Sequence, residues 1–171
     1  MFSVLDRLTD LRVADVMRRD VVKVPSYHTM REAAAILTTH EISGAPVVDD
    51  KDHCIGVITA IDFARYEANV AHCGSDSGLR EHHLRQAQGD APYQIQAERP
   101  DLVSERMSTA VQSIRADAPL IEAAREMCVA HLHRLIVLDG HGHVEGVLTT
   151  LDVVAALVNA VEEQRGPRRV K

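Results

Sequence analysis

The segments GVITAID (56–62) and GVLTTLD (146–152) are near copies of one another and lie 90 residues apart. The same shift of 90 residues aligns residues 13–70 with residues 103–160 without a gap. Two unrelated segments that only share an alternation of apolar and polar residues would not hold one register over this length. The chain therefore contains an internal duplication, and each copy is the unit from which the fold is built.

Each copy is expected to fold as strand, helix, strand, strand and helix. In the first copy, a β-branched run at 21–24 predicts a short strand that ends at Pro25. Thr29 followed by Glu32 is the signature of a capping box at the start of a helix. The remaining strands are expected at 45–48, 55–59, 135–138 and 144–149, and the closing helices begin near 61 and 151.

The predicted fold class is α/β (α+β), with two domains that each hold a small three-stranded sheet and flanking helices. One copy alone cannot bury both faces of so small a sheet, so we expect the two copies to pack about a pseudo-two-fold axis. The expected parts are a leading helix or arm at 1–12 that covers the other copy's sheet, a first domain at 13–70, a polar connector at 71–102 with a helix at 79–88, a second domain at 103–162 and a basic tail at 163–171.

Composition narrows the class of protein. Hydrophobic residues make up 46% of the chain but aromatic residues only 3%, so the core must be aliphatic. No apolar run is long enough for a membrane span, and the charged start of the chain does not resemble a secretory signal. The net charge of −6 argues against a general nucleic-acid partner, and three cysteines without disulfide or metal spacing favour the cytoplasm.

The doubled pattern Gly-hydrophobic-x-Thr-x-x-Asp closely resembles the CBS-domain family, which is named after cystathionine β-synthase. The segments SGAPVVD (43–49) and HRLIVLD (133–139) and the openings DVM (15–17) and ERM (105–107) support the likeness. The resemblance covers all but the connector and the two ends, and it implies a stand-alone tandem pair, or Bateman module. It also implies regulatory binding of AMP, ADP, ATP or S-adenosylmethionine, no required cofactor, a homodimer and a regulated partner protein.

The resemblance places a ligand cleft at the strand ends of each repeat, where Asp62 and Asp152 would accept hydrogen bonds from the two ribose hydroxyls. A carboxylate offers two acceptor oxygens, which matches a cis-diol. Both residues stand at a helix start, so simple helix capping is the alternative reading. Thr59 and Thr149 would add a hydroxyl toward the ribose or the α-phosphate, unless they serve only as β-branched strand residues.

The other residues that the resemblance assigns to the clefts fall into apolar walls and polar contacts. The adenine walls would come from Ala45, Pro46, Leu135 and Ile136, with Val21 and Val111 opposite, and Lys23, Ser43, Gly44, Ile61, Thr109 and Leu151 complete the set. His133 and Arg134 resemble a phosphate-binding pair, since a guanidinium stays charged and binds phosphate bidentately. We therefore expect the second cleft to be better equipped for phosphate, with Arg18, Arg19, Lys23 or Arg134 serving the first.

Three other functions stay open at the level of sequence. Ten histidines, including His72, His82 and His83 beside Cys73 and the pair His141 and His143, allow a zinc-responsive module, although their spacing matches no closed zinc motif. A purely structural dimerisation block would use the apolar faces of the closing helices. An enzyme is not expected, because Cys54, Cys73 and Cys128 have no base at a fixed spacing.

Overall fold

The computed structural model describes residues 9–74 and 101–165. The first repeat contains α2 (Val13–Val16), β1 (Val24–Pro25), α3 (Met30–Thr39), β2 (Gly44–Val48), β3 (Cys54–Thr59) and α4 (Ala60–Gly74). The second contains α5 (Val103–Arg106), β4 (Ser113–Arg115), α6 (Leu120–Val129), β5 (Arg134–Leu138), β6 (Val144–Thr149) and α7 (Thr150–Arg165). Each sheet has one parallel and one antiparallel strand pair, in the orders β1-β2-β3 and β4-β5-β6. The predicted class, two small three-stranded sheets with flanking helices, is confirmed.

The predicted hairpins agree closely with the structure, but the first strand was predicted wrongly. Strand β6 has the expected bounds, and β2, β3 and β5 each begin one residue earlier than expected. The run at 21–24 is not a strand: β1 comprises only Val24 and Pro25, which lie beside Val47 and Val48. Residues 21–23 find no ladder partner in the described sheet, so their β-branched character does not suffice to form a strand.

Helix α4 also differs from the expectation, since it continues to Gly74 into the region predicted as a connector. The connector helix expected at 79–88 lies outside the described residues, as do residues 1–8 of the arm and 166–171 of the tail. In the part of the chain that the structure describes, no helix is long and apolar enough to cross a membrane.

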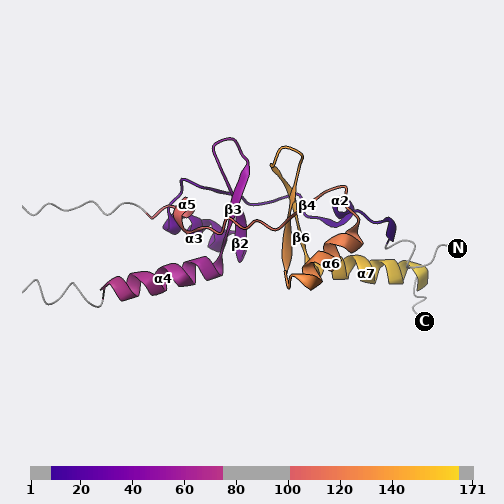
Figure 1. Cartoon of the computed structure of the whole chain (residues 1–171). Coiled ribbons are helices and arrows are strands. Elements are labelled where there is room, and N and C mark those ends of the chain that lie inside the picture. Colours follow the sequence, from indigo (N-terminus) through magenta and orange to yellow (C-terminus); the bar gives the residue numbers. More distant parts are fainter. Residues whose placement is uncertain (1–8, 75–100, 166–171) are drawn as a thin grey trace, which may run out of the picture.

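The short helix that opens each repeat packs into the core of the other repeat. Val13 and Met17 lie in a cluster with Leu135 and Leu148 of the second repeat, and Val103 lies among the buried residues of the first. Figure 1 shows this exchange, with α2 beside β4 and α6 and with α5 beside α3. The segment that packs on the other copy lies at residues 11–17, mostly beyond the arm expected at 1–12, and residues 1–8 of that arm lie outside the described residues. Each core is complete only when both repeats are present.

Backbone pairing between the repeats follows the same pseudo-two-fold relation. Arg18 exchanges two hydrogen bonds of 2.9 Å with Val147 of β6, and Ser108 exchanges two of 2.9 Å with Val57 of β3. The two pairs are related by the 90-residue shift. As a result the hairpins β2–β3 and β5–β6 stand side by side in the middle of the molecule, and α4 and α7 extend to opposite sides (Figure 1).

The glycine of each repeated motif is explained by this close approach. A Cβ atom at Gly56 would lie 2.5 Å from the Met107 sulfur and 2.9 Å from the Ser108 carbonyl oxygen. At Gly146 the matching distances are 2.7 Å to the Met17 sulfur and 3.0 Å to the Arg18 carbonyl oxygen. The motif thus begins with glycine because the opposite repeat's opening segment occupies the space of a side chain.

Candidate functional site

The repeated carboxylates occupy the first turns of the two closing helices. Asp62 Oδ2 accepts hydrogen bonds from the backbone nitrogen of Thr59 at 2.8 Å and from its hydroxyl at 2.7 Å. Asp152 Oδ2 accepts the same pair from Thr149, at 2.9 and 2.6 Å, and both aspartates are 9% exposed. The strand end and the helix start are thereby tied together, so the capping role is real in both repeats.

Capping occupies only one of the two carboxylate oxygens. Oδ2 already accepts two hydrogen bonds, which fills its lone pairs, whereas Oδ1 keeps two further acceptor sites. Among the described residues, Asp62 Oδ1 accepts no hydrogen bond. The cap therefore orients the carboxylate and leaves one oxygen to receive one or both hydroxyls of a diol. The simpler expectation that each oxygen serves one hydroxyl is not what the geometry offers.

The threonine hydroxyls have a narrower role than the sequence suggested. Each hydroxyl has one proton, and Thr59 and Thr149 donate theirs to the aspartate of the same turn. In this arrangement the hydroxyl oxygen accepts further hydrogen bonds but donates none, which suits a ribose hydroxyl and not a phosphate oxygen. Thr149 Oγ1 additionally accepts a long bond of 3.3 Å from the Asp152 nitrogen.

Within the described residues, the carboxylate of Asp152 has a charged partner that the carboxylate of Asp62 lacks. Arg18, which precedes the first strand, places Nε 3.1 Å from Asp152 Oδ1, while its own side chain is 67% exposed. Burial raises the pKa of Asp152, but the hydrogen bonds from Thr149 and then the contact with Arg18 outweigh it, so the pKa is lowered overall. Asp152 is thus held in its charged form with both oxygens engaged.

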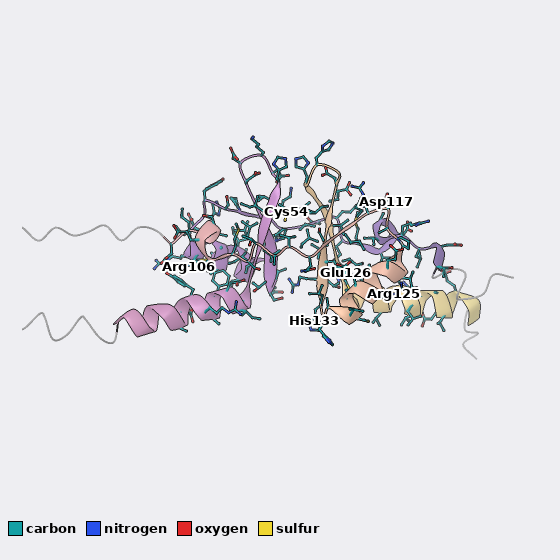
Figure 2. All side chains as sticks on the ribbon, in the orientation of Figure 1. Cys54, Arg106, Asp117, Arg125, Glu126 and His133 are labelled. Carbon is teal, nitrogen blue, oxygen red and sulfur yellow. The ribbon has the colours of Figure 1, made fainter. Side chains whose placement is uncertain are left out.

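The arginine expected to serve the second cleft reaches instead into the first repeat. Arg134 donates from Nη1 to the carbonyl of Gly44 at 3.1 Å and from Nη2 to the hydroxyl of Ser43 at 2.6 Å. Of the two roles expected for Arg134, this contact fits service to the first cleft from across the pseudo-two-fold axis, because the guanidinium crosses between the repeats and lies at the start of β2. Whether it binds phosphate stays a prediction. His133 is exposed, and Figure 2 shows it pointing outward at the base of the hairpin.

The apolar residues predicted to wall the adenine divide between two faces of their strands. Ala45 and Leu135 belong to the core clusters and are 5% and 0% exposed. Side chains alternate along a strand, which places Pro46 and Ile136 on the opposite face. They are buried too, but lie outside both core clusters. Core packing and ligand contact are not exclusive at these four positions, so their place in the adenine walls stays a prediction.

The remaining predicted residues differ in their exposure. Val21 and Val111 are half-buried, and Thr109 is exposed. Lys23 donates to Asp52 at 2.5 Å, so its ammonium is already paired. Ile61 and Leu151, which immediately precede the two aspartates, are strongly exposed on the first turns of their helices. Whether these side chains contact a ligand stays a prediction.

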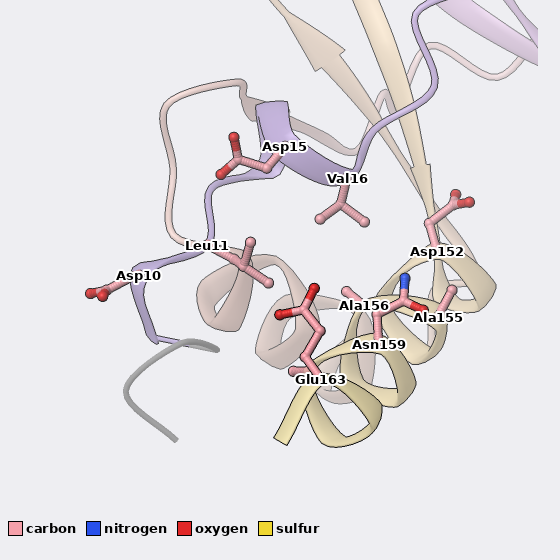
Figure 3. A pocket seen from close by; sticks show the side chains of 10 residues that line it. Asp10, Leu11, Asp15, Val16, Asp152, Ala155, Ala156, Asn159 and Glu163 are labelled. Carbon is pink, nitrogen blue, oxygen red and sulfur yellow. The ribbon is translucent and has the colours of Figure 1, made fainter. Parts of the chain in front are cut away.

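A groove of about 590 Å³ lies beside the second carboxylate and was not anticipated from sequence. Its lining comes from the start of the described chain and from α7, and consists of Asp10, Leu11, Asp15, Val16, Asp152, Ala155, Ala156, Asn159, Ala160 and Glu163 (Figure 3). Asp152 is the one member that sequence reasoning also selected. Four acidic side chains would repel a phosphate group, so this groove does not suit a nucleotide's phosphates. It forms only where separate segments meet, so no local motif signals it.

Histidines meet at the hairpin tips. The rings of His53 and His143 stack with centroids 4.9 Å apart, and each ring nitrogen Nδ1 contacts an aspartate, Asp49 at 3.3 Å and Asp139 at 3.0 Å. The side-chain hydrogen bond from His143 is the main cause that lowers the pKa of Asp139. Over residues 9–74 and 101–165, no group of three or more potential ligand side chains is placed to hold a metal ion. The cluster of His72, Cys73, His82 and His83 lies outside the side chains that the structure describes.

The cysteine nearest the inter-repeat contact does not resemble an activated nucleophile. Cys54 lies high in the β2–β3 hairpin (Figure 2), where its Sγ donates to the Gly56 carbonyl at 3.6 Å. Burial raises the pKa of its thiol and outweighs the opposite effect of that hydrogen bond. A thiol with a raised pKa is a poor source of thiolate.

Comparison with known proteins gives the family of this chain. A family model described as CBS domain matches residues 13–69 and 103–159. The magnesium and cobalt efflux protein CorC of Vibrio cholerae serotype O1 is 29% identical over 161 residues, which are 92% of this chain but only 45% of CorC. This chain therefore spans less than half the length of that relative.

Two solved structures show the same fold. The CBS domain pair of protein MJ0100, in complex with 5′-methylthioadenosine and S-adenosylmethionine, matches with a TM-score of 0.63 at 21% identity over 87% of this chain and 97% of that one. The structure of CBSX2 in complex with AMP matches with a TM-score of 0.64 at 23% identity over 86% and 96%. Since the family model covers both repeats and more than half of the residues, this chain belongs to the CBS domain family as a tandem pair of CBS domains.

Proposed function

We propose that the chain is a regulatory module that binds an adenine nucleotide or related adenosyl ligand between its repeats and signals this state to a partner protein. The observation that carries the proposal is the carboxylate of Asp62 at a helix start, whose Oδ2 is fixed by Thr59 and whose Oδ1 accepts no hydrogen bond from the described residues. The related pairs that were solved with AMP and with S-adenosylmethionine support the choice of an adenosyl group. The proposal assigns no chemical step to the chain.

General energetics favour the binding of both the sugar and the anionic group of such a ligand. A hydrogen bond to a charged carboxylate contributes about 1.5–3 kcal/mol, so a ribose diol gains substantially from Asp62. A cation near the same repeat would then serve a phosphate or another anionic group. Arg134 supplies one at the Ser43–Gly44 edge, and its planar guanidinium can exchange these neutral partners for charged oxygens.

Signalling would follow from the fact that the proposed contacts belong to different repeats. Asp62 lies in the first repeat and Arg134 in the second, so a ligand that touches both favours one arrangement of the repeats. A ligand shifts a conformational equilibrium only by its difference in affinity for the two states. A partner protein that recognises one arrangement would therefore detect the ligand.

Isothermal titration calorimetry tests the binding directly. The native chain is titrated with AMP, ADP, ATP and S-adenosylmethionine separately, and we expect saturable heat with at least one of them. The double substitution of Asp62 and Asp152 by alanine should abolish it. Asp50→Ala removes an exposed carboxylate of equal charge from the hairpin turn and should leave binding unchanged. No heat and no shift in melting temperature with any of the four ligands would refute the proposal.

We further propose that two copies associate through α7. Leu151, Val154, Leu157 and Val158 are exposed by 46–67% and share one side of the helix, as residues three, four and seven apart do. An apolar stripe on one helix is self-complementary across a two-fold axis, which makes a second copy the natural occupant. Light scattering should give twice the monomer mass, and Leu157→Glu should halve it. Val129→Glu, at an equally apolar exposed site on α6, is the control, and an unchanged mass in both variants contradicts this interface.

The proposed cellular location follows the chemistry of the thiols. Cys54 and Cys128 are both free cysteines in the structure. Unpaired thiols persist in a reducing compartment, so we place the chain in the cytoplasm.

A further inference from the structure

Position 18 and position 108 are equivalent in the two repeats but carry different side chains. Both follow a methionine, and both pair with the opposite hairpin through two backbone hydrogen bonds of 2.9 Å. The backbone therefore places residue 18 beside β6, the strand that precedes Asp152. It places residue 108 in the equivalent position beside β3, the strand that precedes Asp62. The Asp152 and Asp62 sites therefore differ in the side chain that the opposite repeat places beside them, which is arginine at position 18 and serine at position 108.

The arginine occupies the oxygen that a ligand would need. Oδ2 of Asp152 is filled by the two hydrogen bonds from Thr149, and Arg18 Nε lies 3.1 Å from Oδ1. At the equivalent first carboxylate, Ser108 makes no hydrogen bond to Asp62 in the described part of the chain, and Oδ1 accepts none. A sugar hydroxyl therefore meets no competing donor at Asp62 Oδ1 among the described residues, but it must displace a charged donor at Asp152.

The second cation between the repeats adds to this inequality. Arg134 lies against Ser43 and Gly44 of the first repeat, where a Cβ on Gly44 would be 3.3 Å from Arg134 Nη1 and 3.1 Å from the Thr59 methyl group. The position equivalent to Arg134 is Gly44 itself, which has no side chain to offer in return. The first repeat thus combines an open carboxylate oxygen with a nearby guanidinium.

We propose that the two clefts fill in order, the Asp62 cleft first, and that Arg18 is an internal competitor that lowers the affinity of the Asp152 cleft for the sugar of the ligand. This inference rests on the proposed function and specifies how its two sites differ. Because Arg18 is mostly exposed, its contact with Asp152 is exchangeable, and the second cleft is weakened but not closed. The module then responds to two ranges of ligand concentration.

The test exchanges the two residues, one cleft at a time. In an Asp62→Asn background, titration with adenosine, AMP and S-adenosylmethionine reports the second cleft, and adding Arg18→Ser should tighten binding about tenfold. In an Asp152→Asn background, adding Ser108→Arg should weaken the first cleft by a similar factor. Adenosine has no phosphate, so an effect shared by adenosine and AMP must arise at the sugar.

Arg19→Ser is the matched control, because it removes the neighbouring positive charge, which donates to the Ala14 carbonyl at 3.2 Å and not to Asp152. It should leave the second cleft unchanged. Unchanged or weaker binding in Arg18→Ser would overturn the inference, since Arg18 would then be neutral or a contributor to the ligand site. If the native chain binds a probe and the exchange has no effect, only this inference fails; if neither the native chain nor any variant binds a probe, the proposed function fails with it.

Discussion

The first and second repeats have the same backbone and pair with each other by the same bonds, yet they send different side chains across the contact. The first sends Arg18 to Asp152, and the second sends Ser108 toward β3 and Arg134 to Ser43 and Gly44. A duplicated fold thereby keeps two carboxylates in matching positions while giving them unequal surroundings. The comparison teaches that the scaffold fixes where a ligand could bind, and that single side chains from the opposite repeat decide how readily each cleft accepts it.

The largest loss of stability is expected when the methionines in the opening segments of the two repeats are truncated. Met17 is 8% exposed within the second repeat's core, whereas Met107 is only half-buried against the first. Truncation of a buried methionine commonly costs 2–5 kcal/mol, so Met17→Ala should lower the free energy of unfolding by about 3 kcal/mol and Met107→Ala by less. Chemical denaturation measures both values.

Hydrogen exchange of the methionine variants shows where the loss falls. Because α2 packs into the opposite repeat, Met17→Ala should speed amide exchange in β5 and β6 more than in β2 and β3. Faster exchange confined to the first repeat would contradict the cross-packing of the opening helices.

A smaller effect is expected at the motif glycines. An alanine Cβ at Gly146 would meet the Arg18 carbonyl at 3.0 Å and at Gly56 the Ser108 carbonyl at 2.9 Å, so the opposite segment must move away. Overpacking of this kind costs about 1–3 kcal/mol, which exceeds the entropic gain of about 0.4–1 kcal/mol from replacing glycine. Thermal unfolding should show both variants destabilised.

Gly140→Ala provides the comparison for both glycines. Its added Cβ would come no closer than 3.5 Å to its neighbours, the nearest being Arg115 Nη1. A melting temperature close to that of the native chain is therefore expected. Equal losses at Gly140 and Gly146 would show that the inter-repeat approach does not explain the motif.

A loss of about 1 kcal/mol is expected when the cap that distinguishes α3 from α6 is removed. The Thr29 hydroxyl oxygen accepts from the Glu32 nitrogen at 3.2 Å, and Glu32 Oε2 accepts from the Thr29 nitrogen at 2.8 Å, whereas Pro119 at the equivalent place offers no side-chain cap. Thr29→Ala should cost about this amount in denaturant unfolding. Thr38→Ala, in the last turn of the same helix, should be nearly neutral, and a similar loss there would remove the special role of the cap.

Local patterns allowed the strands of both hairpins, the Thr29 cap and the starts of the closing helices to be predicted to within a residue or so, because each depends on neighbours in the chain. The strand at 21–24 failed because a strand needs a partner, and only Val24 and Pro25 have one in β2. The packing of α2 and α5 into opposite repeats could be predicted only in part from the sequence, since the burial of Val13 depends on contacts with the distant second repeat.

The same distinction, between features set by neighbours in the chain and features set by distant contacts, applies to the candidate site. The Asp and Thr of each motif could be selected from sequence, because their spacing ties them to one turn. The directions of Arg18 and Arg134 could not, since both side chains cross between repeats and nothing in their local sequence encodes the crossing. Ala45 and Leu135 were expected in the adenine walls and lie in the core clusters, since strand alternation separates two faces but the packing of α2 and α5 decides which face is the core.

The smallest expected effect concerns the pKa of Asp152, where the hydrogen bonds from Thr149 and the contact with Arg18 both lower the value against the opposing effect of burial. A carboxylate whose pKa is lower in the folded state than in the unfolded chain stabilises the fold above its unfolded pKa of about 3.9. That stabilisation is lost as the pH falls through the folded value. Since the Thr149 bonds contribute more than Arg18, Arg18→Ser should raise the pKa only part of the way toward its usual value.

Carboxyl carbon NMR titration of native and Arg18→Ser chains measures this partial rise, with Arg19→Ser as the control of equal charge. A full return to the usual value would show that Arg18 and not Thr149 holds Asp152 ionised. An unchanged value would show that the guanidinium does not engage Oδ1 in solution, and the two carboxylates would then present equally open oxygens to a ligand. The unequal surroundings of the two repeats therefore depend on a contact that can be measured before any ligand is added.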